Sequence, residues 1–167
     1  VWDLDNTLWD GILLEDRDVK LRKDIKRVLR TLDERGILLS IASKNEHRTA
    51  MEKLVEMGLD SYFLYPQINW NSKSHSIKLI TEKLNINTDS IAFVDDSDFE
   101  LDEVKFELPE VMCIHADDIP LMLEMPELDP VHVTEDARMR RKMYLGEIQR
   151  SADEEGFRGP KEAFLRS

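Results

Sequence analysis

The chain has 167 residues, of which 41% are hydrophobic, and this size and composition fit one globular domain with a single core and a tail. Its net charge of −12 argues against nucleic acid as the main partner, because binding a phosphate backbone requires clustered positive charge. No apolar run is long enough to cross a membrane, no signal peptide is visible, and a single cysteine excludes an internal disulfide framework. We therefore expect a cytoplasmic protein with no membrane or nucleic-acid partner. Because the chain starts without Met, inside an expected strand, we also expect it to be a piece of a longer polypeptide.

The hydrophobic pattern alternates between strand and helix. An apolar strand over 1–4 precedes a stretch over 9–21 that lacks helical period and suggests a hairpin or flap. Helices are then expected over 24–35, 46–57, 73–84 and 99–104, and further strands over 37–43, 62–64, 91–96 and 111–115. This alternation predicts an α/β fold: a Rossmann-like, doubly wound parallel sheet with helices on both faces.

The pattern changes after residue 118. We expect a catalytic core over 1–118, followed over 119–167 by a connection and a helical tail that leads to or from further domains. The tail carries a helix over 134–155 and a basic cluster, made of Arg138, Arg140, Arg141 and Lys142. This cluster is either a solvated helix face or a docking patch for an acidic carrier protein or a phosphate.

Polar side chains follow the expected strands at their carboxyl ends, where the working residues of such a sheet gather. They are Asp3 and Asp5 after the first strand, Ser43, Lys44 and Asn45 after the second, and Asp95 and Asp96 after the fourth, with Lys73 opening the helix before it. Crowded carboxylates need a compensating positive charge, and Mg²⁺ prefers oxygen ligands. The sequence therefore predicts a magnesium site with a hydroxyl and backbone donors for phosphate oxygens and a lysine that balances the charge.

Simpler interpretations stay open for several of these residues. Ser43 and Asn45 could cap the following helix as well as bind phosphate. Lys73 could be an ordinary helix-start lysine, although a cation there is unfavourable to the helix dipole. Cys113 could take part in a thioester step, but its apolar strand setting favours a buried structural thiol. The acidic residues that follow Asp96 are interpreted as a solvated face: Asp98, Glu100, Asp102 and Glu103.

Four segments, "DLDNT", "IASKN", "NSKS" and "FVDDSD", occur in the order of the four motifs of the haloacid dehalogenase superfamily, and the chain resembles that superfamily over residues 1–118. The resemblance implies that Asp3 is a nucleophile forming an aspartyl-phosphate, that Asp5 is the general acid and base, and that Lys73 steadies both nucleophile and phosphate. It implies that Mg²⁺ is held by Asp3, by the backbone carbonyl of Asp5 and by Asp95, with Asp96 as an additional or outer ligand. The substrate-binding residues would be Asn6, Thr7, Ser43, Lys44 and Asn45.

Finer detail in "DLDNTLWDG", "INWNSKS" and "FVDDSDFELDEV" is similar to the FkbH-like glyceryltransferase/phosphatase group associated with polyketide synthases. That resemblance implies use of 1,3-bisphosphoglycerate, removal of phosphate, and delivery of a glyceryl unit to the phosphopantetheine thiol of an acyl carrier protein. The chain departs from the group at Asp10, where Gly is more usual, and at "LEDR", where the group has a GEDG turn. These two departures lie in the flap and affect its expected shape.

The stretches between Asp5 and Ser43 and between Ser43 and Lys73 are filled by the flap, two helices and a strand, so neither holds a cap domain. We therefore expect a capless, open site. Two alternatives remain: a capless phosphatase acting on a small molecule or a phosphoprotein, and a receiver-like scaffold that binds metal or phosphate without turnover. A pure phospho-acceptor needs no general acid at Asp5, and this residue separates the alternatives.

Overall fold

The computed structural model describes the backbone of residues 1–166 and the side chains of residues 1–156. Its central sheet is parallel and consists of β3 (Ala42–Ser43) beside β4 (Gln67–Ile68), and β5 (Ala92–Asp95) beside β6 (Met112–His115). The N-terminal segment joins the two pairs, because Trp2 forms parallel bridges with both Ile41 and Val94. The order across the sheet is therefore β4, β3, the N-terminal segment, β5 and β6.

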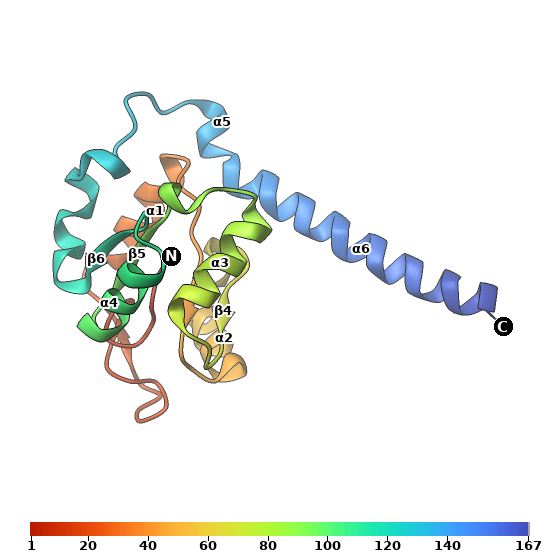
Figure 1. Cartoon of the computed structure of the whole chain (residues 1–167), viewed down its shortest axis with the longest axis horizontal. Helices are drawn as coiled ribbons and strands as arrows, with labels where there is room; N and C mark the ends of the chain where they lie inside the picture. The colour runs from red at the N-terminus through yellow and green to blue at the C-terminus, as the bar shows by residue number, and fades with distance from the viewer. Residues whose placement is uncertain (167) are drawn as a thin grey trace.

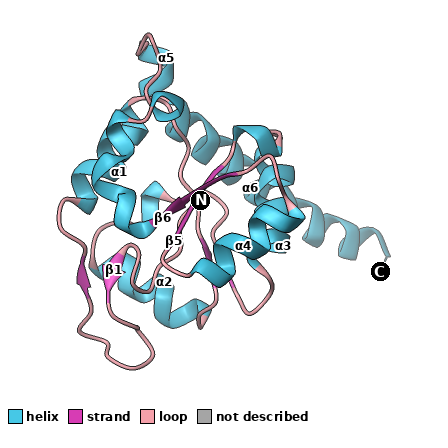
Figure 2. Cartoon of the chain, turned by 60° about the vertical axis from the view of Figure 1, so that its left-hand side comes forward, coloured by secondary structure: helices cyan, strands magenta, loops and turns pink. Residues whose placement is uncertain are grey.

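Helices cover both faces of this sheet. On one face pack α1 (Ile25–Glu34) and α2 (His47–Glu56), and on the other pack α3 (Lys73–Leu84) and α4 (Asp98–Glu107). Figure 2 shows α3 and α4 together on one side of β5 and β6, with α1 on the other side. Successive strand residues point to opposite faces, and Phe93 and Val94 accordingly lie in separate hydrophobic clusters. The Rossmann-like α/β fold expected from the sequence is thus confirmed.

Three helices begin near the carboxyl edge of the sheet with a side-chain cap. The Glu46 carboxylate accepts hydrogen bonds from the first backbone amides of α2, and the hydroxyls of Ser72 and Ser97 do the same for α3 and α4. Each cap satisfies backbone amides in the first turn of its helix, and each helix begins within a few residues of a strand end. The residues next to these caps are thereby held at one edge of the sheet.

The expected flap is an antiparallel hairpin. Its strands are β1 (Trp9–Asp10) and β2 (Lys20–Leu21), with Trp9 opposite Leu21. Gly11 follows β1 with a positive φ of 95°, a conformation that glycine adopts without a steric penalty. Leu13 and Val19 are buried, so the hairpin is anchored to the core on one side.

One expected strand is displaced, and one expected helix is divided. The strand expected over 62–64 is displaced: a 3-10 turn, η1 (Asp60–Tyr62), occupies its start, Phe63 makes a single bridge to Leu39, and the paired strand is β4 further on. The helix expected over 134–155 is divided at Met139 into α5 (Glu135–Arg138) and α6 (Arg140–Arg166). In the second case the Thr134 hydroxyl caps a separate short helix.

The chain after β6 first packs on the core and then leaves it. The 3-10 segments η3 (Ala116–Glu124) and η4 (Pro126–Leu128) bury Ile119, Met122 and Leu128 in the same hydrophobic cluster as α1. Figure 1 shows α6 projecting away from the body of the molecule as a long rod. Core packing therefore continues beyond residue 118, and the expected division into 1–118 and 119–167 stays a prediction.

Two of the four basic residues of the tail anchor α6 to the core. The Arg141 guanidinium donates to both carboxylate oxygens of Asp33, at 2.8 and 3.3 Å, and lies 4.8 Å from the centre of the Tyr62 ring. Arg140 donates to the carbonyl oxygen of Gly36 at 3.1 Å. Arg140 and Arg141 thus make contacts within the chain, and a docking role for the basic cluster stays a prediction.

Among the described residues, no helix combines the length and the apolar character that a membrane crossing requires.

Candidate active site

The predicted site residues meet in an open hollow at the carboxyl edge of the sheet. The hollow has a volume of about 220 Å³. It is lined by residues from the N-terminal segment, the flap, the ends of β3 and β5, and the starts of α3 and α4: Asp3, Asp5, Asn6, Ile12, Lys44, Lys73, Asp95, Asp96, Ser97 and Glu100. Of the residues predicted from the sequence, Thr7, Ser43 and Asn45 lie behind this lining and are almost completely buried.

Lys73 links two strand ends at the floor of the hollow. Its Nζ donates to Asp3 Oδ1 at 2.9 Å and to Asp95 Oδ2 at 2.8 Å, and its side chain is only 4% exposed. Burial acts to lower the pKa of Lys73, but the two carboxylates outweigh it and the pKa is raised. Lys73 is therefore a fixed cation between the two acids, and its position as the first residue of α3 has a role beyond starting a helix.

The same burial acts on the carboxylates in the opposite sense. Desolvation raises the pKa of Asp3 well above its usual range, the charge of Lys73 opposes this shift, and the nearby Asp95 adds to it. The pKa of Asp95 is also raised, again by burial and against the effect of Lys73. The positive charge of Lys73 therefore does not fully offset the cost of burying the negative charges of Asp3 and Asp95.

Carboxylate oxygens of Asp3, Asp95 and Asp96 lie within 4.8 Å of one another and could hold a metal ion. The Thr7 hydroxyl lies 3.0 Å from Asp3 Oδ2 and 3.3 Å from Asp96 Oδ1, so it can donate to one of them at a time. Oxygen donors of this kind suit a hard divalent cation such as Mg²⁺, whose charge would relieve the crowding described above. The side chain of Asp5 is not part of this group.

Asp5 faces the hollow but is held by three donors. Its Oδ1 accepts hydrogen bonds from the Trp9 indole Nε1 at 2.9 Å and from the Leu13 backbone amide at 3.0 Å. Its Oδ2 accepts one from Asn45 Nδ2 at 3.0 Å. Two of these donors belong to the flap and the third follows β3, so the Asp5 carboxylate joins these two parts of the site.

The remaining predicted substrate-binding residues have distinct surroundings. Asn6 has a positive φ of 55° and its Oδ1 accepts a hydrogen bond from the Gly11 amide at 3.0 Å, which fixes the start of the flap. The Lys44 ammonium lies 2.9 Å from Glu100 Oε1 across the hollow and is the more accessible of the two lysines that line it. The hydroxyl of Thr7 and the amide of Asn45 contact the acids Asp3 and Asp5 in this structure, and their role in substrate binding stays a prediction.

Glu100 was interpreted from the sequence as part of a solvated face, and the structure places it in the lining of the hollow. Its Oε2 is buried and makes no hydrogen bond among the described residues. A signal was available in the sequence: Glu100 comes three residues after the capping Ser97, on the first turn of a helix that starts at the site.

Cys113 lies away from the hollow. It is opposite Phe93 in the sheet, packs against the second hydrophobic cluster, and its thiol lies 3.8 Å from the carbonyl oxygen of Leu101. Burial raises the pKa of the thiol, which disfavours the reactive thiolate. These surroundings fit the structural interpretation of the cysteine.

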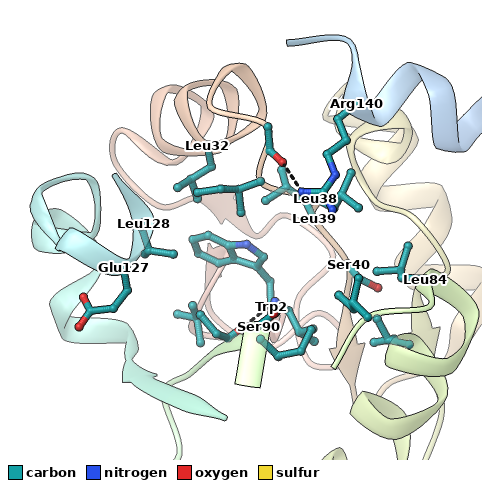
Figure 3. Close-up of a pocket in the computed structure, with 18 of the residues that line it drawn as sticks. Trp2, Leu32, Leu38, Leu39, Ser40, Leu84, Ser90, Glu127, Leu128 and Arg140 are labelled. Atoms are coloured by element: carbon teal, nitrogen blue, oxygen red, sulfur yellow. Dashed lines mark hydrogen bonds between the residues drawn. The ribbon is translucent and has the colours of Figure 1, made fainter. Parts of the chain in front are cut away.

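A second cavity, of about 260 Å³, lies at the opposite edge of the sheet (Figure 3). Most of its lining residues are apolar, with Trp2, Leu32, Leu39 and Leu84 pointing toward it, but Glu127 and Arg140 also border it. It shares no residue with the hollow that holds the acids. The larger cavity is thus separate from the candidate chemistry.

The fold and the site define a class of domain suited to phosphoryl chemistry. The sheet is Rossmann-like, and its carboxyl edge carries a buried lysine, a nucleophile candidate and a group of acids. Comparison with known families agrees: the chain belongs to the haloacid dehalogenase-like hydrolases, whose family model matches residues 9–104. The matched range begins after Asp3 and Asp5, so the roles of these two residues rest on their geometry and on the motif resemblance.

One solved structure similar to this chain is the N-terminal part of the protein BF1531 from Bacteroides fragilis, which contains a phosphatase domain and is complexed with Mg. The two chains are 26% identical with a TM-score of 0.59, and the similarity covers 86% of this chain but 38% of the other. This chain therefore spans well under half of that protein. No curated protein matches the chain in sequence.

Proposed function

We propose that this chain is a magnesium-dependent phosphatase-type domain that transfers a phosphoryl group through Asp3. The observation that carries the proposal is the junction at the floor of the hollow, where Lys73 lies within 3 Å of both Asp3 and Asp95 and where Asp96 completes a group of three acids. Phosphoryl transfer depends mainly on positioning and on neutralising charge, and these residues supply both.

The proposed reaction has two displacements. A carboxylate oxygen of Asp3 attacks the phosphorus of the substrate, the bond to the leaving oxygen breaks, and Asp5 gives that oxygen a proton. Water then attacks the aspartyl-phosphate, Asp5 takes a proton from the water, and inorganic phosphate leaves Asp3. Lys73 holds Asp3 in place throughout both steps.

Asp3, Asp95 and Asp96 would hold the magnesium ion together with the backbone carbonyl of Asp5. When bound, the ion would supply positive charge to the phosphoryl oxygens. The similarity to the magnesium-complexed phosphatase domain supports this choice of metal.

Release of phosphate from an aryl phosphate ester tests the proposal, measured with and without Mg²⁺. The account predicts metal-dependent turnover by the wild-type protein and loss of turnover in Asp3→Asn. The matched control is Asp102→Asn, which changes an exposed acid on α4 and should leave the rate unchanged. Magnesium binding without turnover would instead favour the receiver-like scaffold.

As a finer proposal, the phosphorylated substrate is 1,3-bisphosphoglycerate and the acceptor is the phosphopantetheine thiol of an acyl carrier protein. The motif resemblance supports this, and so does the open hollow, which has the hairpin on one side and no cap domain over it among the described residues. Mass spectrometry of a carrier protein after incubation with bisphosphoglycerate tests it. A glyceryl mass gain on the phosphopantetheine arm is expected, and phosphate release without that gain would leave the simpler phosphatase.

A further inference from the structure

We propose that Trp9 and Asn45 are positioning residues that hold the Asp5 carboxylate in one orientation for proton transfer to the leaving group. This inference rests on the proposed phosphoryl transfer and adds to it a role for two side chains that do not line the hollow. Both are buried, Trp9 with 0% and Asn45 with 1% of its surface exposed.

The hydrogen bonds distinguish the two oxygens of Asp5. Oδ1 accepts from both the Trp9 indole and the Leu13 amide, which occupies its two lone pairs. Among the residues whose side chains are described, Asn45 alone donates to Oδ2, which keeps one lone pair. The geometry therefore selects Oδ2 as the oxygen that exchanges a proton with the substrate.

The two donors are themselves fixed. Asn45 Oδ1 accepts a hydrogen bond from the Glu46 amide at 3.0 Å, and this bond requires the NH₂ group of Asn45 to face Asp5. Trp9 lies in β1, where its backbone is paired with Leu21 of β2, and its indole is completely buried in the core. Asp5 is consequently held between the flap and the residue before the cap of α2.

A purely structural role for these contacts makes a different prediction from a positioning role. If Asp5 only ties the flap to the core, removing a donor should reduce all activities alike. If these hydrogen bonds orient the Asp5 carboxyl group for proton transfer, the loss of catalytic rate should depend on how much the leaving group needs that proton. An alkyl phosphate needs it, whereas 2,4-dinitrophenyl phosphate has a leaving group that departs without protonation.

The test measures kcat and KM of the full chain with Mg²⁺ for glycerol phosphate and for 2,4-dinitrophenyl phosphate. The variants are Trp9→Phe, which removes the indole N–H and keeps an aromatic ring, and Asn45→Ala. We expect kcat/KM, which covers formation of the aspartyl-phosphate and not its hydrolysis, to fall about 10- to 100-fold for the alkyl ester and to change less than about threefold for the dinitrophenyl ester. Matched controls are Trp70→Phe and Asn87→Ala, which change exposed residues outside the hollow.

The ratio of the two rates in one preparation does not depend on the fraction of folded protein, so partial unfolding of a variant cannot imitate the expected result. Equal losses on both esters, or no loss on either, would overturn the positioning role while leaving the proposed function in place. A wild-type protein inactive on both esters would instead overturn the proposed function, and this inference with it.

Discussion

Lys73 lies between two buried carboxylates, and its removal should leave these charges facing each other. Lys73→Met is expected to lower the free energy of unfolding in metal-free buffer by about 3 to 5 kcal/mol, the usual cost of breaking a buried ion pair. Urea unfolding measures it. Lys78→Met, on the exposed face of the same helix, is the matched control and should change stability little. Equal effects of the two substitutions would contradict the role given to Lys73.

The raised pKa of Asp3 gives stability a defined pH dependence in the absence of metal. Burial raises this pKa above the usual 3.8, so the folded protein holds the Asp3 proton more tightly than the unfolded chain does. Protonated Asp3 therefore stabilises the folded protein below the pKa that Asp3 has in the unfolded chain. This stabilisation is lost as pH rises through the pKa that Asp3 has in the folded protein. Asp3→Asn mimics the protonated acid, and its stability relative to wild type should therefore increase as pH rises. Urea unfolding across pH checks this, and a relative stability that falls with pH would refute it.

At the scale of elements, the attachment of α6 to the core depends on Arg141. This guanidinium binds Asp33 of α1 through two hydrogen bonds, and both side chains are largely shielded from water. Arg141→Ala should reduce the free energy of unfolding by about 2 kcal/mol, in the range for hydrogen bonds to charged groups. Hydrogen exchange should also show faster opening of the first turns of α6.

Lys142→Ala provides the comparison, because Lys142 is the exposed neighbour of Arg141 on the same helix. Its effect on stability and on exchange in α6 should be small. Identical exchange in both variants and wild type would mean that α6 is held by other contacts, such as the packing of Tyr144, Leu145 and Ile148.

At the scale of the whole molecule, the strand and helix order was predictable because burial imposes regular periods on the sequence. Ile25, Val28, Leu29 and Leu32 recur at helical spacing, and the same four are buried in α1. The grouping of Asp3, Lys73 and Asp95 followed from topology, since the carboxyl ends of parallel strands share an edge.

What the sequence did not predict depends on tertiary contacts without a local signature. The paired strand begins only at Gln67, because residues 60–62 form a 3-10 turn. The short apolar run over 62–64 does not indicate this turn in the sequence. The Lys44 to Glu100 pair joins the residue after β3 to α4, which is far away in the chain, and the donors to Asp5 come from both the flap and the segment after β3. Such contacts are visible only after the fold brings the elements together.

If Asp3, Asp95 and Asp96 form one site for a divalent cation, Mg²⁺ should stabilise the folded chain, and thermal unfolding with and without the ion measures this. Saturating Mg²⁺, at about 100 times its dissociation constant, should stabilise the wild-type chain by about 2.7 kcal/mol, because the ion binds the folded state alone. Asp95→Asn should lose this gain, whereas Asp102→Asn should retain it. If Mg²⁺ leaves the unfolding of the wild-type chain unchanged, or if Asp95→Asn responds as wild type does, the three acids do not form the site described here.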